Sequence, residues 1–322
     1  MPRMNHILSV TGPIYLAIAT GFIAVRLGVF ARADAQVLGR FVLHFALPAM
    51  LFSALASRQF ADVMHLDYLL AYALGSLVAF GVSWWIGRWA AKEDLTLRAL
   101  MGMGGSCSNT GYIGYPILLG LLGPSAAVGL ALCLLVENLL MLPLALSLAE
   151  SGQATHASWQ RNVVESFKRL TRTPMLWAIV LGLTFSMMGW HLPQVIDKAV
   201  GLFSVACAGT ALFVNGCSLV GLRVQGMLSR ISGIVLAKLL VHPLAVGFFM
   251  WLLGTVEPSL QISGVVLASM PMLGIYPLFA QRYGREGICA AALLLTTLLS
   301  FFTISAWLAL SDWVPGWSAL MH

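Results

Sequence analysis

Apolar residues recur in runs of about twenty along the whole chain, the length that an α-helix needs to cross the hydrocarbon core of a bilayer. Polar residues gather in the short connections between the runs, and no alternation typical of a transmembrane β-barrel is visible. The pattern predicts an all-α polytopic membrane protein with ten transmembrane helices. The predicted spans cover residues 6–26, 37–57, 66–87, 98–122, 124–148, 173–190, 196–221, 231–254, 261–281 and 286–310.

Composition agrees with this interpretation, since 59% of the 322 residues are hydrophobic and only 9% are charged. Soluble domains carry about 25% charged residues. The first run lacks a small-residue cleavage site after a short core, so we interpret it as a retained span and not as a signal peptide. The five cysteines all lie within predicted spans and lack metal-ligand spacing. We therefore expect no disulfide, no metal site and no cofactor.

The positive charges are distributed unevenly between the two sides of the predicted membrane protein. The chain carries a net charge of +6, and 14 of its 18 Lys and Arg residues lie near the odd-numbered connections between spans. Cytoplasmic loops carry the excess of Lys and Arg, so this bias places both termini outside the cytoplasm. The excess of positive charge thus indicates how the protein is oriented in the membrane, and we expect no nucleic-acid partner.

The fourth and ninth predicted spans are interrupted. The stretch 102–123 reads GMGGSCSNTGYIGYPILLGLLG, and its glycines and Pro116 disfavour one continuous helix. Pro271, Gly274 and Pro277 interrupt the ninth span in the same way. Within a membrane, backbone leaves the helical conformation only where protein buries it or where it lines a cavity. Broken helices of this kind point to a transporter's binding site.

The two interrupted spans are related by an internal repeat. An offset of 161 residues aligns PIYLAIATGF at Pro13 with PMLWAIVLGL at Pro174, and Tyr115-Pro116 with Tyr276-Pro277. Each copy holds five spans, an odd number, so the second copy must be inverted in the membrane. We expect two inverted five-helix repeats, residues 1–160 and 161–322, whose broken fourth and ninth helices cross.

Polar residues at the first break are the candidate substrate ligands. They are Ser106, Ser108, Asn109, Thr110 and Tyr112, together with Pro116. Gly274 and Pro277 contribute from the second break, where Met270 replaces Asn109, so we expect an asymmetric site with most of its polarity from the first repeat. The alternative role of Ser106 and Asn109 is to cap a half-helix.

Three ionisable residues lie deep within predicted spans, where such side chains mark functional sites by default. Glu137 is a candidate carrier of a coupling proton, or else a partner in a fixed ion pair. Lys238 and His242 share one face of the eighth span and are candidates for substrate binding and coupling, respectively, or for bridging helices. Asn215, Thr210, His44 and Pro48 are weaker candidates, for which packing is the favoured role.

Motifs of nucleotide-driven pumps and of enzymes are absent: there is no Walker loop, GxSxG or HExxH. The segments FVLHFALPAMLFSALA at 41–56, SNTGYIGYPILLGLLG at 108–123 and MPMLGIYPLFAQRYG at 270–284, with the repeat itself, resemble the auxin efflux carrier family. Its bacterial members include malonate-type carriers.

The resemblance implies a fold like that of bile-acid symporters and sodium–proton antiporters. Helices one, two, six and seven would form a scaffold and dimer contact, and helices three to five and eight to ten a moving transport domain. Plant members of the family present an asparagine before the crossover proline to an anionic substrate, and Asn109 occupies the matching place. Related sodium-coupled transporters have acidic residues near the crossover, and this sequence has none there. The comparison therefore argues against sodium as the coupling ion.

Together these expectations describe a secondary carrier of a small mono- or dicarboxylate, similar to malonate, working by alternating access in a bacterial inner membrane. We expect transport to be driven by a proton gradient or by the membrane potential, and a homodimer is the expected assembly. Two alternatives stay open: an uncoupled channel or facilitator, and a membrane receptor that binds without transporting.

Overall fold

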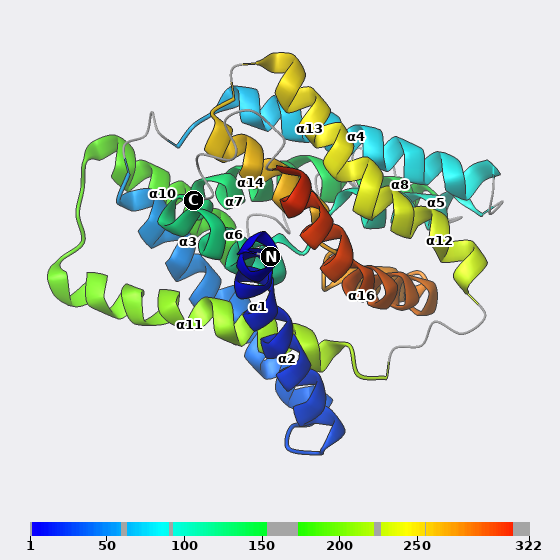
Figure 1. Cartoon of the computed structure of the whole chain (residues 1–322), viewed down its shortest axis with the longest axis horizontal. Helices are drawn as coiled ribbons and strands as arrows, with labels where there is room; N and C mark the ends of the chain where they lie inside the picture. The colour runs from blue at the N-terminus through cyan, green and yellow to red at the C-terminus, as the bar shows by residue number, and fades with distance from the viewer. Residues whose placement is uncertain are drawn as a thin grey trace.

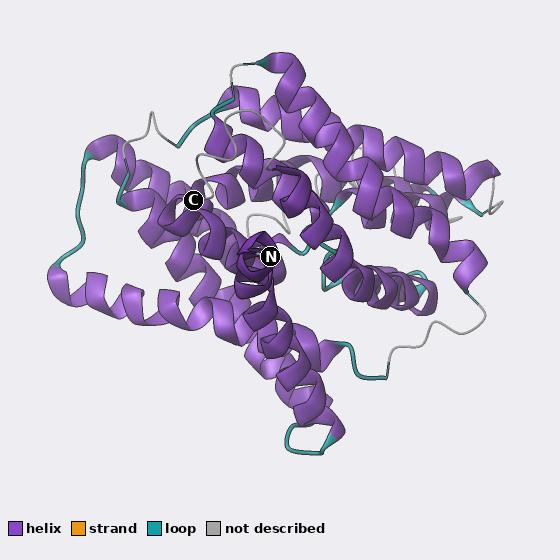
Figure 2. Ribbon diagram, viewed as in Figure 1, coloured by secondary structure: helices purple, strands orange, loops and turns teal. Residues whose placement is uncertain are grey.

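The computed structural model describes residues 2–58, 63–89, 93–152, 173–221, 227–254 and 256–311, with the side chains of 2–11, 32, 124 and 309–311 left aside. The described residues are helical almost throughout, and none of them forms a strand (Figure 2). The α-helices are α1 (Pro2–Arg26), α2 (Arg32–Phe41), α3 (Leu47–Ala56), α4 (Leu66–Trp89), α5 (Leu95–Ser106), α6 (Tyr115–Leu122), α7 (Ala126–Val136), α8 (Leu142–Ser151), α10 (Pro174–Met188), α11 (Gln194–Ser218), α12 (Leu228–Leu236), α13 (His242–Leu253), α14 (Pro258–Ser269), α15 (Tyr276–Gln281) and α16 (Glu286–Ser311).

Four π-helical turns occur among the described residues: η1 (Val42–Ala46), η3 (Thr110–Gly114), η5 (Glu137–Met141) and η6 (Ala237–Val241). Three of them join consecutive α-helices into longer rods, and η3 begins the half-helix that continues as α6. After each turn, the next residue's N–H donates to the carbonyl five residues back, and a proline follows immediately. A proline lacks an N–H and its ring obstructs the carbonyl four residues back, so the chain accommodates it with one extra residue in the preceding turn.

Pro243 shows how the released backbone groups are satisfied. Its ring displaces the carbonyl of Leu239, four residues earlier, from the helical hydrogen-bond pattern. That carbonyl accepts a hydrogen bond from the indole N–H of Trp307 on α16, at 3.3 Å. The interruption of one helix thereby becomes a contact with another.

Among the described residues, six helical rods are long and apolar enough to cross a membrane: Ala33–Ala56, Leu66–Trp89, Ala126–Ser151, Gln194–Ser218, Leu228–Leu253 and Glu286–Leu308. Four shorter apolar helices accompany them, at Gly12–Arg26, Thr110–Leu122, Pro174–Met188 and Pro258–Ser269. These findings confirm an all-helical membrane protein. Several basic residues on which the expected orientation depends (Lys92, Arg161, Lys168, Arg169, Arg172 and Arg223) lie outside the described residues.

The helices pack as two groups. In the first helix group (α1–α3, α10 and α11), α1 crosses and packs against α11, and α10 packs against α3 (Figure 1). In the second helix group (α4–α8 and α12–α16), α4 packs against α13 and α5, and α14 packs against α13 and α7. The groups meet where α11 contacts η3 and α6, where α1 contacts α16 and α6, and where α3 contacts α7.

Glycines bring α1 and α11 into backbone contact. A Cβ added at Gly216 would lie 1.8 Å from the carbonyl oxygen of Ile18, and one at Gly21 would lie 2.0 Å from that of Phe213. The Cys217 thiol donates to the Gly21 carbonyl at 3.3 Å. Small residues that let backbones approach are a main source of helix association in membranes, where lipid is as apolar as leucine.

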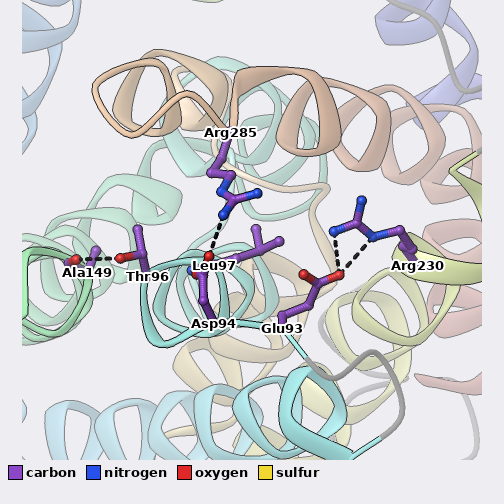
Figure 3. A network of polar contacts seen from close by, with 7 residues as sticks. All are labelled: Glu93, Asp94, Thr96, Leu97, Ala149, Arg230 and Arg285. Carbon is purple, nitrogen blue, oxygen red and sulfur yellow. Dashed lines mark hydrogen bonds and ion pairs between the residues drawn. The ribbon is translucent and has the colours of Figure 1, made fainter. Parts of the chain in front are cut away.

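In the described part of the chain, three ion pairs tie together one end of the second helix group. Arg230 pairs with Glu93 at 2.5 Å, Arg282 pairs with Glu150 at 2.9 Å, and Arg285 pairs with Asp94. Figure 3 shows Glu93 and Asp94 side by side before α5, each reaching an arginine from a different segment. Asp94 also caps α5, because its side chain accepts from the N–H of Leu97 at 2.7 Å.

Candidate functional site

The interruptions of the fourth and ninth predicted spans lie against each other. Helix α5 ends at Ser106, α14 ends at Ser269, and the backbone beyond each is extended. Ser108 and Met272 form an isolated antiparallel bridge. The N–H of Asn109 donates to the Pro271 carbonyl at 2.8 Å, and that of Leu273 donates to the Cys107 carbonyl at 3.3 Å. Each break thus satisfies backbone groups of the other.

Glu137 binds to the first break from η5. One carboxylate oxygen accepts from the backbone N–H of Ser108 at 2.7 Å, and the other accepts from the Thr110 hydroxyl at 3.2 Å. The side chain is buried. Because the half-helix formed by η3 and α6 begins at Thr110, the carboxylate lies at its N-terminal end, where the partial positive charge of the helix stabilises an anion.

Lys238 binds the same break from the opposite side and also reaches the second one. Its ammonium group donates to the Ser108 hydroxyl and to the Ala268 carbonyl, both at 2.7 Å, and lies 2.9 Å from Nδ1 of His242. Ala268 is in the last turn of α14, whose C-terminal end carries partial negative charge. The ammonium has three N–H donors, and all three have partners.

His242 continues this buried chain of contacts. Since an ammonium only donates, Nδ1 of His242 accepts, and Nε2 then carries the proton and donates to the Ser76 hydroxyl at 3.0 Å. The network therefore connects α4, η6, α13 and both breaks. Ser108 lies between Glu137 and Lys238, and no direct ion pair joins those two residues among the described contacts.

Asn109 turns away from the charged network and reaches the other helix group. Its Nδ2 donates to Oδ1 of Asn215 on α11 at 3.0 Å. Both side chains are buried, and both have an amide atom without a hydrogen-bond partner, Oδ1 of Asn109 and Nδ2 of Asn215. Asn215, for which sequence reasoning favoured packing, is thus the direct partner of the foremost candidate.

A cavity of about 70 Å³ borders the first break. Its polar lining comes from Asn109, Thr110, Tyr112, Glu137 and Asn138. The remaining walls are apolar or backbone: Leu43, Leu47, Cys107, Gly111, Leu134, Leu142, Met175, Leu273, Gly274 and Ile275. A volume of this size holds a few water molecules and suits a small ligand.

The other candidate residues fall into two sets. Gly274 lines the cavity and packs against Asn109, since a Cβ at Gly274 would lie 3.3 Å from Nδ2. Tyr112 lines it and donates to the Gly39 carbonyl at 3.2 Å, a second polar contact between the groups. Ser106 instead donates to the Gly102 carbonyl of its own helix at 2.8 Å. Ser106, Ser108, Pro116, Pro277, Lys238 and His242 are not among the residues that line the cavity.

Sequence reasoning did not single out Asn138 or Ser76. Asn138 lines the cavity while its Nδ2 donates to the Leu134 carbonyl at 2.8 Å. Its position beside Glu137 in an otherwise apolar span was an available signal. The sequence around Ser76 offered no such signal, because single serines are common in apolar membrane helices.

A model of the family described as membrane transport protein matches residues 6–308. The chain belongs to this family. A similar protein is "Putative malonate transporter" of Rhizobium meliloti, 26% identical over 311 residues, which is 95% of this chain and 96% of that protein.

Two further relatives are also transport proteins by name. "Uncharacterized transporter YfdV" of Escherichia coli is 25% identical over 276 residues, covering 80% of this chain and 86% of that one. "Auxin efflux carrier component 8" of Arabidopsis thaliana is 22% identical over 265 residues, covering 66% of this chain and 71% of that protein. The expected relationship to auxin efflux carriers is confirmed, and this membrane transport protein is a transporter and not an enzyme.

Proposed function

We propose that this membrane transport protein is a secondary active carrier of a small mono- or dicarboxylate, similar to malonate, that works by alternating access. The observation that carries the proposal is the meeting of two broken helices beside a small cavity whose mostly apolar lining includes several polar side chains. Discontinuous helices that meet within a membrane are how secondary transporters build their binding sites. The name of the Rhizobium meliloti relative supports malonate as the first substrate to test.

The proposed architecture is ten transmembrane helices in two inverted repeats, residues 1–160 and 161–322. Helices α6 and α15 begin at Tyr115 and Tyr276, which keeps the offset of 161 found in the sequence. The first helix group corresponds to the scaffold and the second to the transport domain. Their separate packing supports movement of one group against the other.

In this proposal Asn109, Thr110, Tyr112 and Gly274 contact the substrate, because they line the cavity. Ser108 and Lys238 hold the two breaks together beside it. Ser106, Pro116 and Pro277 shape the half-helices from within them. Glu137 is the candidate proton carrier, and His242 extends its network towards α4. We further propose a homodimer in a bacterial inner membrane, with both termini on the periplasmic side.

Binding is tested first by thermal unfolding of the purified protein with a panel of small carboxylates, because a ligand that binds only the folded state raises the apparent melting temperature. We expect malonate to raise Tm in the parent protein and not in Asn109→Ala. Ser269→Ala is the matched control, since Ser269 ends the other broken helix and donates only to its own helix, to the Val265 carbonyl. Retained affinity in Asn109→Ala would overturn the crossover site.

Coupling is tested by uptake into proteoliposomes with an imposed pH gradient or membrane potential. A coupled carrier accumulates substrate in response to one of them. Flux that ignores both would identify a facilitator, and binding without flux would identify a receptor. Glu137→Gln is expected to stop accumulation, and normal accumulation in that variant would leave Glu137 with a structural role.

A further inference from the structure

Two arginines at one end of the second helix group have neither an ion pair nor a side-chain hydrogen bond among the described residues. Arg88 lies in the last turn of α4, and Arg98 lies near the start of α5. Three carboxylates at this end, those of Glu93, Asp94 and Glu150, each pair with another arginine. The guanidinium groups of Arg88 and Arg98 are therefore left without a negative partner from the described part of the chain.

Arg98 turns away from the acidic residue nearest to it in the sequence. Asp94 precedes it by four positions, a spacing at which opposite charges on a helix attract each other. The Asp94 carboxylate is instead engaged by the N–H of Leu97 and by Arg285 (Figure 3). The guanidinium carbon of Arg98 lies 4.3 Å from the ring centre of Trp84, on the neighbouring helix α4. Arg98 is therefore held against α4 by a cation–π contact.

This contact brings the side chain of Arg98 to the last turns of α4. The side chain packs against Gly87, since a Cβ added there would lie 3.0 Å from Cγ of Arg98. Trp84 and Arg88 are four positions apart on α4 and thus share one face of that helix. We call Trp84, Arg88 and Arg98 the arginine site. It combines two positive charges and one aromatic ring from two helices.

The negative charge that the backbone supplies to the arginine site is too small to balance it. The C-terminal end of a helix such as α4 carries about half an elementary charge, whereas each guanidinium group carries a full one. Arg98 is half-buried, and its Nε is buried without a hydrogen-bond partner. Positive charge withdrawn from water is costly unless a negative group approaches it. The site therefore favours an anion, and guanidinium groups bind phosphate through paired N–H donors.

The depth of the site in the membrane selects among ligands that carry a phosphate. Helix α4 has 24 residues and is thus about 36 Å long, more than the hydrocarbon core of about 30 Å. Trp85 and Trp89, in its last turns, are 61% and 63% exposed, and tryptophan is enriched at the level of the lipid headgroups. A headgroup with net negative charge suits the site better than a zwitterionic one, because the carboxylates of Glu93 and Asp94 beside it are already engaged.

We propose that the arginine site binds the phosphate group of an anionic phospholipid. Arg88 and Arg98 contact the phosphate oxygens, and Trp84 positions the guanidinium group of Arg98. The lipid headgroup then joins the end of α4 to the start of α5. None of the three residues lines the cavity beside the two breaks, so this inference does not depend on the proposed function.

The test is native mass spectrometry of the purified protein titrated with dioleoylphosphatidylglycerol or dioleoylphosphatidylcholine, which differ in headgroup charge but share their acyl chains. The first phosphatidylglycerol should bind at least about tenfold more tightly than phosphatidylcholine, because hydrogen bonds between charged groups are strong. Arg98→Gln and Arg88→Gln should each remove most of this preference. Arg40→Gln is the matched control and should keep it, since Arg40 is an exposed arginine in the last turn of α2.

Equal affinity for the two lipids in the parent protein would overturn the inference. An equal loss in Arg40→Gln would also overturn it, because attraction by overall charge would then explain the preference. Inorganic phosphate is the probe for a soluble anion: if it raises Tm as much as phosphatidylglycerol does, the site does not belong to a lipid. If Arg98→Gln fails to fold, Arg88→Gln decides, because Arg88 is exposed. A preference that survives in Arg88→Gln would place the lipid elsewhere.

Discussion

The ammonium nitrogen of Lys238 lies 2.7 Å from the hydroxyl oxygen of Ser108. These residues are 130 positions apart, and their contact attaches the eighth predicted span to the break in the fourth. The backbone N–H of the same serine donates to Glu137. One residue thus mediates between a buried cation and a buried carboxylate.

Removal of one of these charges should cost more stability than removal of both. Lys238→Met leaves the Glu137 carboxylate buried without a compensating cation, a loss of about 3–5 kcal/mol in comparable pairs. Glu137→Gln added to that variant should recover a large part of the loss. Thermal unfolding of both single variants and of the double variant measures the coupling, and strictly additive effects would show that the two charges do not compensate each other.

The crossing of α1 and α11 should tolerate no side chain at Gly216. An alanine Cβ there would lie 1.8 Å from the Ile18 carbonyl, which is backbone and moves only with its helix. We expect Gly216→Ala to destabilise the protein by at least about 1–3 kcal/mol. Gly209→Ala on the same helix is the control, since its Cβ would meet no atom within 4 Å. Equal melting temperatures for the two variants would contradict this close approach.

Gly274→Ala should weaken substrate binding with little effect on stability. The added Cβ would lie 3.3 Å from Nδ2 of Asn109, so the amide must shift by a few tenths of an ångström. Small displacements of binding groups are costly, and we expect about a tenfold loss of malonate affinity. Gly287→Ala, where the nearest atom would be at an ordinary 3.8 Å, serves as control in the same titration. Unchanged affinity would show that the position of Asn109 is not critical.

Two variants of Asp94 should separate its cap from its ion pair. Asp94→Asn keeps an acceptor for the Leu97 N–H and loses the charge that pairs with Arg285, whereas Asp94→Ala loses both. An exposed ion pair contributes about 0–1 kcal/mol and a helix cap about 1 kcal/mol. We therefore expect a small, salt-sensitive loss for Asp94→Asn and a larger loss for Asp94→Ala. Equal losses would assign the whole effect to the ion pair.

The interrupted helices were predictable because proline and glycine act locally. Pro116 and Pro277 mark where helices restart, and the structure begins α6 and α15 at the preceding tyrosines. Asn109 was correctly placed beside the break and at the edge of a cavity. These conclusions required only the chemistry of neighbouring residues.

Contacts between distant helices were not predictable in the same way. The pairing of Asn109 with Asn215, and the choice of Ser108 and Ala268 by Lys238, depend on how each helix is rotated about its axis. In a soluble helix the polar face reveals that rotation, but in a membrane apolar residues face both lipid and protein. The π-helical turns also change the rotation part-way along a helix, and they were not foreseen.

Those turns give the prolines an influence beyond their own positions. Successive residues of an α-helix are about 100° apart around its axis, so one additional residue turns everything before it by about that angle relative to everything after it. Glu137 and Lys238 both lie within such turns, and Pro143 and Pro243 are the second residues after those turns end. Exchanging either proline for alanine would allow an ordinary turn to form, and the charged side chain would then point towards a different neighbour. The direction in which each buried charge points therefore depends on a proline several residues further along the chain.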